Sequence, residues 1–222
     1  MQAGVLGVVD GDFDVVDSFS DSVTDGDREL ARRLEIRGVF SLPSGEMAFA
    51  GRAAEEYLRE RETHAIEDGE IEVREDPRVG TRYTEFVGVP GEFVVVGSGD
   101  GEFAFDLVSA DTNTDVERAT LDLDGFFTAH GSARPWQAGF YGAGDDPVTG
   151  VVHGSDLRNE YDLDGMLADS NLNQVGLTYE YDGEDVKMTA SRSGYVELYR
   201  PQTFGREDYL EYLREEVLSH VE

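Results

Sequence analysis

Two segments of the chain share the motif Asp-Leu-Asp-Gly, at residues 122–125 and 162–165. Carboxylates two residues apart and followed by a Gly form part of a calcium-binding loop. The rest of that pattern is missing, because no third oxygen ligand precedes the Gly and no Glu closes the loop. We therefore expect the Asp side chains to cap helices. The alternative is a cation-dependent enzyme, whose ligands would be Asp122, Asp124, Asp162 and Asp164, with His130 or His153.

A second group of residues suits recognition better than catalysis. Residues 130–137 contain the only Trp of the chain beside an Arg and an amide, and residues 171–174 contain three amides in four positions. Neutral donors and acceptors with one aromatic ring are typical of sites for a polar ligand or a peptide. The predicted recognition face consists of Arg134, Trp136, Gln137, Asn171, Asn173 and Gln174. The alternative is that Trp136 fills the core and the amides cap loops.

Other catalytic chemistry has little support in the sequence. The four His residues are scattered, and neither a His-Glu-x-x-His motif nor a Gly-x-Ser-x-Gly elbow occurs. The absence of Cys excludes disulfides, thiol nucleophiles and thiolate zinc sites. We expect no cofactor, and the leading hypothesis is a non-enzymatic binding or protein-interaction protein.

The same segments suggest an internal repeat. The Asp-Leu-Asp-Gly motifs are 40 residues apart, while Gln137-Ala-Gly139 and Gln174-Val-Gly176 are 37 apart. The unit would be a short helix followed by a hairpin, over about residues 112–150 and 152–192. The alternative is chance combined with common turn chemistry. Duplicated units of this kind resemble the half-repeats of TATA-binding-protein-like and sliding-clamp-like folds, which implies a third hypothesis, a nucleic-acid-associated protein.

Turn signals of the Asp-Gly type between apolar runs predict antiparallel hairpins. Six candidates centre on residues 10–11, 44–45, 68–69, 100–101, 144–145 and 182–183. Alternating apolar residues predict that strand 93–97 pairs with 103–107, and strand 177–181 with 186–190. A further strand is expected over residues 195–199, before Pro201.

Helical periodicity occurs in fewer places. Apolar spacing predicts helices over residues 27–36, 52–61 and 206–221, and short helices after Asp124 and Asp164. The expected class is α+β, an antiparallel sheet built from hairpins with interspersed helices and a C-terminal helix packed on the sheet. Pro77 and Gly80 suggest a boundary between a region 1–80 and a region 81–222.

Charge is unevenly spread along the chain. Residues 1–27 contain seven Asp and no basic residue, whereas residues 28–82 contain 10 Arg and 13 acidic residues. The middle segment is close to neutral, so we expect it to face a protein partner or a second copy of the chain.

The overall composition is strongly acidic, with 48 acidic and 18 basic residues and a net charge of -30. All basic residues but Lys187 are Arg. This composition resembles that of cytoplasmic proteins from salt-in halophilic archaea, which implies a cytoplasmic location. At molar salt the screening length falls to about 3 Å, so such self-repulsion is tolerated. Acidity disfavours nucleic-acid partners without excluding them, and we expect no membrane span.

Overall fold

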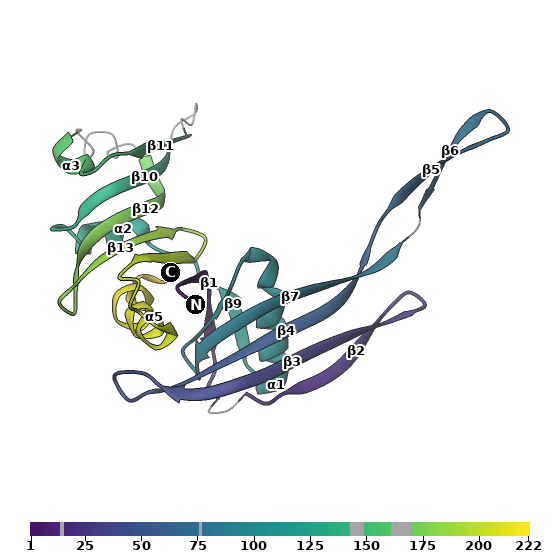
Figure 1. Ribbon diagram of the computed structural model, residues 1–222, viewed down its shortest axis with the longest axis horizontal. Coiled ribbons are helices and arrows are strands. Elements are labelled where there is room, and N and C mark those ends of the chain that lie inside the picture. Colours follow the sequence, from purple (N-terminus) through teal and green to yellow (C-terminus); the bar gives the residue numbers. More distant parts are fainter. Residues whose placement is uncertain (14–15, 76, 143–148, 161–169) are drawn as a thin grey trace.

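The computed structural model describes residues 1–13, 16–75, 77–142, 149–160 and 170–222. Most of its strands belong to one antiparallel sheet (Figure 1). In chain order these strands are β1 (Ala3–Asp10), β2 (Phe19–Asp25), β3 (Arg28–Ser41), β4 (Met47–Arg59), β7 (Arg78–Val89), β8 (Phe93–Val96), β9 (Asp115–Arg118), β10 (Arg134–Gly142), β11 (Thr149–His153), β12 (Ser170–Tyr181), β13 (Glu184–Ser191) and β14 (Tyr195–Arg200).

Strand β1 lies at the centre of the sheet and joins two halves. The order across the sheet is β11-β10-β12-β13-β14-β1-β8-β7-β4-β3-β2, and β9 pairs with the end of β1. We refer to β8, β7, β4, β3 and β2 as the N-terminal half, and to β14, β13, β12, β10 and β11 as the C-terminal half. All pairings are antiparallel, so the fold is the mixed, mostly antiparallel α+β class expected from the hairpin signals.

The helices cover opposite faces of the two halves. Helix α1 (Phe103–Thr112) packs with Val5, Phe86 and Val94 on one face of the N-terminal half. The other face carries α2 (Leu123–Ala129) and α5 (Arg206–Tyr212), which pack with Leu6, Val196 and other core residues of the C-terminal half. Burial of each such side chain contributes roughly 1.5–3 kcal/mol. The face of the C-terminal half on the α1 side is therefore left without any of these three helices.

The C-terminal helix is present, as the amphipathic pattern predicts. After α5 the chain continues as a π-helical turn, Leu213–Val217, and a short 3-10 turn, Leu218–His220. Leu213 and Val217 are buried, and the Tyr209 hydroxyl donates a hydrogen bond of 2.9 Å to the carbonyl of Val196 in β14. The remaining short helices are the 3-10 turn η1 (Gly99–Gly101) and α3 (Leu157–Glu160). None of the described helices is long and apolar enough to cross a membrane.

Two predicted helices are wrong, because residues 27–36 and 52–61 lie mainly in strands β3 and β4. Leu30 and Leu34 are both buried in β3. Residues four apart share a face in a strand as well as in a helix, so this spacing cannot separate the two. Long-range pairing with neighbouring strands then decides the conformation.

The predicted strand over residues 103–107 is also wrong, because these residues begin α1. The Asp100-Gly101 turn belongs to η1 and leads into a helix instead of a hairpin. Phe103, Ala104, Phe105, Leu107 and Val108 are all buried, and Asp106 alone is exposed among residues 103–108, so one polar residue is too few to reveal the helical period. The expected hairpins at residues 44–45, 68–69 and 182–183 are present, whereas β1 ends at Asp10 without one. The turn at 144–145 lies outside the described residues.

Strands β4 and β7 extend beyond the sheet and continue as β5 (Glu62–Glu67) and β6 (Glu70–Glu75), a two-stranded ribbon (Figure 1). We call residues 59–78 the arm. The register is the same on both sides of the interruption, since Arg59 pairs with Arg78 and Glu62 with Glu75. The boundary expected near residue 80 falls within β7, and the division into two regions stays a prediction.

Candidate functional site on the Trp136 face

Strands β10 and β12 bring the predicted recognition residues side by side. They pair antiparallel, with Gln137 opposite Gly176 and Gly139 opposite Gln174. Arg134, Trp136 and Gln137 lie on β10, while Asn171, Asn173 and Gln174 lie on β12. The structure therefore places all six on neighbouring strands, although 34 residues separate Gln137 from Asn171 in the chain.

Two β-bulges interrupt this pairing and aim extra side chains at one face. One register shift falls between Pro135 and Gln137, so Trp136 is the additional residue on β10. The other falls beside Gly139, where Asn173 is the additional residue on β12. A bulge places two neighbouring side chains opposite one residue of the partner strand, and such features often re-aim a side chain beside a functional site.

A Gly lies opposite each bulge and leaves room for the extra side chain. A Cβ added to Gly176 would lie 2.6 Å from Cε2 of Trp136, and one added to Gly139 would lie 2.5 Å from Oδ1 of Asn173. Each of the two side chains thus lies over the Gly of the other strand. This arrangement is locally symmetric, but the helix that the repeat predicts after Asp164 lies outside the described residues, and the duplication stays a prediction.

The indole of Trp136 crosses β12 at Gly176 and reaches β13. Its Nε1 donates a hydrogen bond of 3.2 Å to the carbonyl of Met188. The ammonium of Lys187 lies 4.3 Å from the ring centroid, a cation–π contact that contributes about 0.5–1 kcal/mol. Tyr199 meets the ring edge-on at 5.7 Å, and the ring of His153 lies 6.5 Å away. The only Trp and the only Lys of the chain are therefore in contact.

Polar and aromatic side chains surround this indole. Arg134 faces Asp185 at 3.9 Å, and both side chains are mostly exposed. Tyr199 is 40% exposed, and the Tyr195 hydroxyl donates to Glu197 at 2.9 Å. Burial and then the contact with Glu197 raise the pKa of Tyr195 to about 12, so this phenol is neutral at ordinary pH. We define the Trp136 face as Arg134, Trp136, Gln137, His153, Asn173, Gln174, Lys187 and Tyr199.

The interpretation that Trp136 merely fills the core is not favoured by its surroundings. The side chain is only partly buried, and its ring contacts are Lys187, Tyr199 and His153. Gln137 is 8% exposed, whereas Asn173 and Gln174 are half-buried. Asn171 lies farther along β12, opposite Tyr141. Of the six predicted residues, Trp136, Gln137, Asn173 and Gln174 converge most closely.

The first Asp-Leu-Asp-Gly segment caps a helix and belongs to no metal-ligand cluster among the described residues. Asp122 caps α2 and accepts a hydrogen bond of 2.9 Å from the backbone of Gly125, as the capping interpretation expects. Asp162 and Asp164 lie outside the described residues. Among the residues with a described position, no group of three or more acidic or His side chains could hold a metal ion.

His130 forms a partly buried pair with Glu216. Its Nδ1 lies 2.8 Å from the carbonyl of Phe126, and its Nε2 lies 2.8 Å from Oε2 of Glu216. Both partners are acceptors, so a doubly protonated imidazolium satisfies both contacts. Burial lowers the pKa of His130, but the hydrogen bonds to Glu216 and Phe126 outweigh it and raise the pKa overall. The pair joins α2 to the C-terminal helix.

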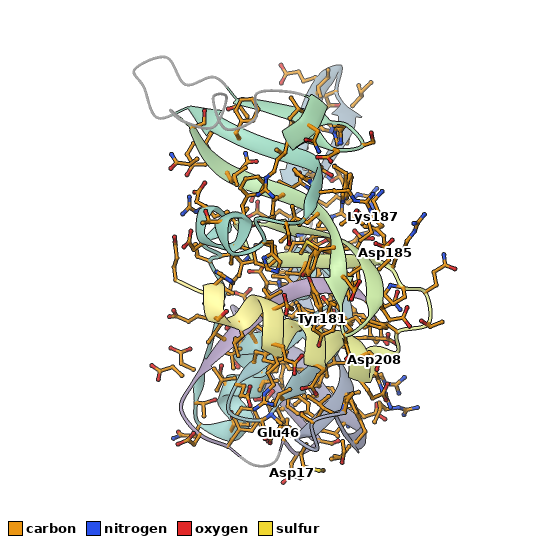
Figure 2. All side chains as sticks on the ribbon, turned by 90° about the vertical axis from the view of Figure 1, so that its left-hand side faces the viewer. Asp17, Glu46, Tyr181, Asp185, Lys187 and Asp208 are labelled. Atoms are coloured by element: carbon orange, nitrogen blue, oxygen red, sulfur yellow. The ribbon has the colours of Figure 1, made fainter. Side chains whose placement is uncertain are left out.

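A hollow of about 450 Å³ lies between the β3–β4 turn, the β12–β13 turn and α5, and half of its lining residues are acidic. Tyr181 and Asp208, two of the lining residues, are labelled in Figure 2. Three of the lining carboxylates already accept hydrogen bonds from other parts of the protein. Glu211 accepts from the Ser44 hydroxyl at 2.8 Å, Glu215 accepts from Tyr181 at 2.6 Å, and Asp208 accepts from the backbone of Gly205 at 2.7 Å. We therefore do not assign a ligand to this hollow.

No protein-family model matches the chain, and neither does any curated protein. Function must therefore be inferred from the geometry of the chain itself. The sequence prediction of the face missed His153, Lys187 and Tyr199. The rarity of Lys in this composition was the available signal, because a residue type used once in 222 positions is informative. Its position over Trp136 depends on strand pairing, which the sequence does not reveal.

Proposed function

We propose that this protein is a non-enzymatic binding protein adapted to high salt, and that the Trp136 face receives a polar ligand or a segment of a protein partner. The observation that carries the proposal is the pair of bulges, which bring Trp136, Gln137, Asn173 and Gln174 onto one sheet face. A single bulge could be an accident of packing. Two bulges, each opposite a Gly, position these side chains with little freedom.

The chemistry of the face supports recognition by stacking and hydrogen bonding. The indole supplies apolar area, and the amides supply donors and acceptors that do not change charge with pH. Lys187 and Arg134 are the cations of the face, in a protein whose surface is otherwise dominated by carboxylates. A ligand segment with a carboxylate or carbonyl groups fits these donors.

A capture experiment tests the proposal. The tagged protein and an Arg134→Glu/Lys187→Glu variant are incubated in molar KCl with a lysate of a salt-in archaeon, and the bound proteins are compared by mass spectrometry. An Arg28→Glu/Arg37→Glu variant, with the same change in net charge on β3, is the control. A partner that binds the wild type and the control, but not the Arg134→Glu/Lys187→Glu variant, is then purified and titrated into the wild-type protein. Its binding is measured by the change in the fluorescence of Trp136. Identical capture by all three proteins would contradict the proposal.

One observation favours a second candidate, binding of single-stranded nucleic acid. Trp136, Tyr199, His153 and Lys187 gather on one sheet face, and bases stack on such aromatic side chains. Asp185 and Glu197 lie beside them and weaken the attraction for phosphates. Titration with single-stranded oligonucleotides in molar KCl distinguishes the candidates, because stacking would quench the fluorescence of Trp136 whereas a face that recognises proteins would leave it unchanged.

A further inference from the structure

The most exposed apolar side chains of the described chain lie at the tip of the arm. Ile66 is 79% exposed and Ile71 is 72% exposed, and these two residues pair directly across β5 and β6. Val73, 57% exposed, pairs with His64 on the same side of the ribbon, since side chains two residues apart share a face. An apolar face on a projecting ribbon is unusual in so acidic a protein and indicates an interaction surface.

The same face of the ribbon is apolar again where the arm joins the sheet. The pairing register is the same in the arm and at its base, and side chains alternate between the two faces of a ribbon. The face with Ile66 and Ile71 therefore carries the even-numbered residues of β4 and β5 and the odd-numbered residues of β6 and β7. That face carries Leu58 opposite Val79, and Ala54 opposite Tyr83. Tyr83 is 57% exposed and Val79 is 44% exposed. An apolar tip is thus followed, about 40 Å along the ribbon, by an apolar root.

A hollow lies at the root of the arm, beside Ala54 and Tyr83. It has a volume of about 240 Å³, and Ala54, Tyr83, Arg33, Glu35 and Arg52 contribute to its lining. This volume is sufficient for the ends of two aliphatic side chains. The rim contains two Arg residues, one of which, Arg52, also pairs with Glu35 at 2.7 Å.

Charged side chains beside the tip and the root lie on the opposite face of the ribbon. By the same alternation, that face carries Glu70 and Glu72 at the tip and Arg78 and Arg82 at the root. Arg82 lies over the ring of Phe103 in α1. The tip is therefore complementary to the root of another copy in apolar surface and not in charge.

We propose that the occupant of this surface is a second copy of the chain, with two arms packed antiparallel about a two-fold axis. The tip of each arm, with Ile66 and Ile71, inserts into the hollow beside Ala54 and Tyr83 of the other. The axis passes near Glu60 and Pro77, halfway between tip and root. A two-fold contact of this kind is self-complementary and closes without further growth.

The area is sufficient for a specific dimer. Covering the exposed parts of Ile66, Ile71, Val73, Val79 and Tyr83 removes about 600 Å² per copy, or about 1,200 Å² for the pair, which is the lower limit for stable interfaces. Both tip and root belong to the Arg-rich middle segment, and neither overlaps the Trp136 face. The dimer is therefore independent of the proposed binding function.

Sedimentation velocity in molar KCl, over a range of protein concentrations, is the first test. We expect a reversible dimer for the wild type. Ile66→Asp/Ile71→Asp should weaken it about tenfold to a hundredfold, because both side chains are central to the contact. Val151→Asp changes a side chain of β11 that is 52% exposed and remote from the arm, and should leave the dimer unchanged. If the wild-type protein stays monomeric at all concentrations, the proposal is overturned, and the apolar face would be a site for a different protein.

Cross-linking tests the antiparallel geometry, since the chain has no native Cys. Ile66→Cys and Ala54→Cys proteins are oxidised separately and after mixing. Covalent dimers should form mainly in the mixture, because position 66 of one arm meets position 54 of the other. Ala54→Cys mixed with Val151→Cys is the control and should not cross-link. Equally efficient cross-linking of Ile66→Cys with itself would place tip against tip and overturn the antiparallel arrangement.

Discussion

The position of the Trp136 indole over Gly176 can be tested by adding one methyl group. In Gly176→Ala the new Cβ would lie 2.6 Å from Cε2 of Trp136 and 2.9 Å from Cβ of Gln137. Separations this short do not occur between unbonded carbons, so the indole must move away from β12. We expect it to lose the hydrogen bond to Met188 and the contact with Lys187.

The expected cost follows from these contacts. The hydrogen bond contributes about 0.5–1.5 kcal/mol and the cation–π contact about 0.5–1 kcal/mol. Ala in a strand recovers about 0.5–1 kcal/mol relative to Gly, because it restricts the unfolded chain. If the indole cannot move, overpacking costs about 1–3 kcal/mol instead. The free energy of unfolding should therefore fall by up to about 2 kcal/mol if the indole moves, and by about 1–3 kcal/mol if it cannot.

Urea denaturation in molar KCl measures this loss, and the emission of the single Trp reports the displacement as a shift to longer wavelength. Gly38→Ala is the matched control, because a Cβ at Gly38 in β3 would have no atom within 4 Å. It should stabilise the protein by about 0.5–1 kcal/mol, because only the unfolded chain is restricted. In a Trp136→Ala background, Gly176→Ala should cost less, because only the contact with Cβ of Gln137 remains, and a double-mutant cycle detects the difference. If Gly176→Ala changes the free energy of unfolding no differently from Gly38→Ala and leaves the emission unchanged, the described position of the indole is wrong.

Three further predictions concern stability. Lowering KCl from molar to about 0.1 M lengthens the screening distance to about 10 Å, so the melting temperature should fall; an unchanged value would remove the argument for adaptation to salt. Leu213→Ala should cost about 2–5 kcal/mol, because Leu213 is 1% exposed, and a loss below about 0.5 kcal/mol would show that the C-terminal helix does not pack on the sheet. The pKa of His130 is raised in the folded protein, so its stabilising effect is complete below the unfolded pKa of about 6.5 and is lost as the pH rises through the folded value. The free energy of unfolding should therefore decrease from pH 6 toward alkaline pH, and His130→Gln should flatten this dependence; the same slope in both proteins would assign it to other groups.

Several features could be predicted from the sequence because their causes are local. The turn at Asp182-Gly183 adopts positive φ at both residues, which Asp and Gly tolerate, and it forms the predicted hairpin. The C-terminal helix follows from one apolar stripe that includes Leu213 and Val217. Trp136 and the amides were identifiable as candidates because they differ from the carboxylate-rich remainder of the chain.

The tertiary structure alone decided the features that depend on distant pairing. Leu30 and Leu34 suit a helix and a strand equally well, and pairing with β2 and β4 makes them part of a strand. The Trp136 face exists because β10 pairs with β12 through two bulges, and because the indole reaches a carbonyl 52 residues away in the chain. Side-chain type and short-range spacing are properties of the sequence. Register, bulge position and the sheet face left free of α1, α2 and α5 are settled only when all strands pack together.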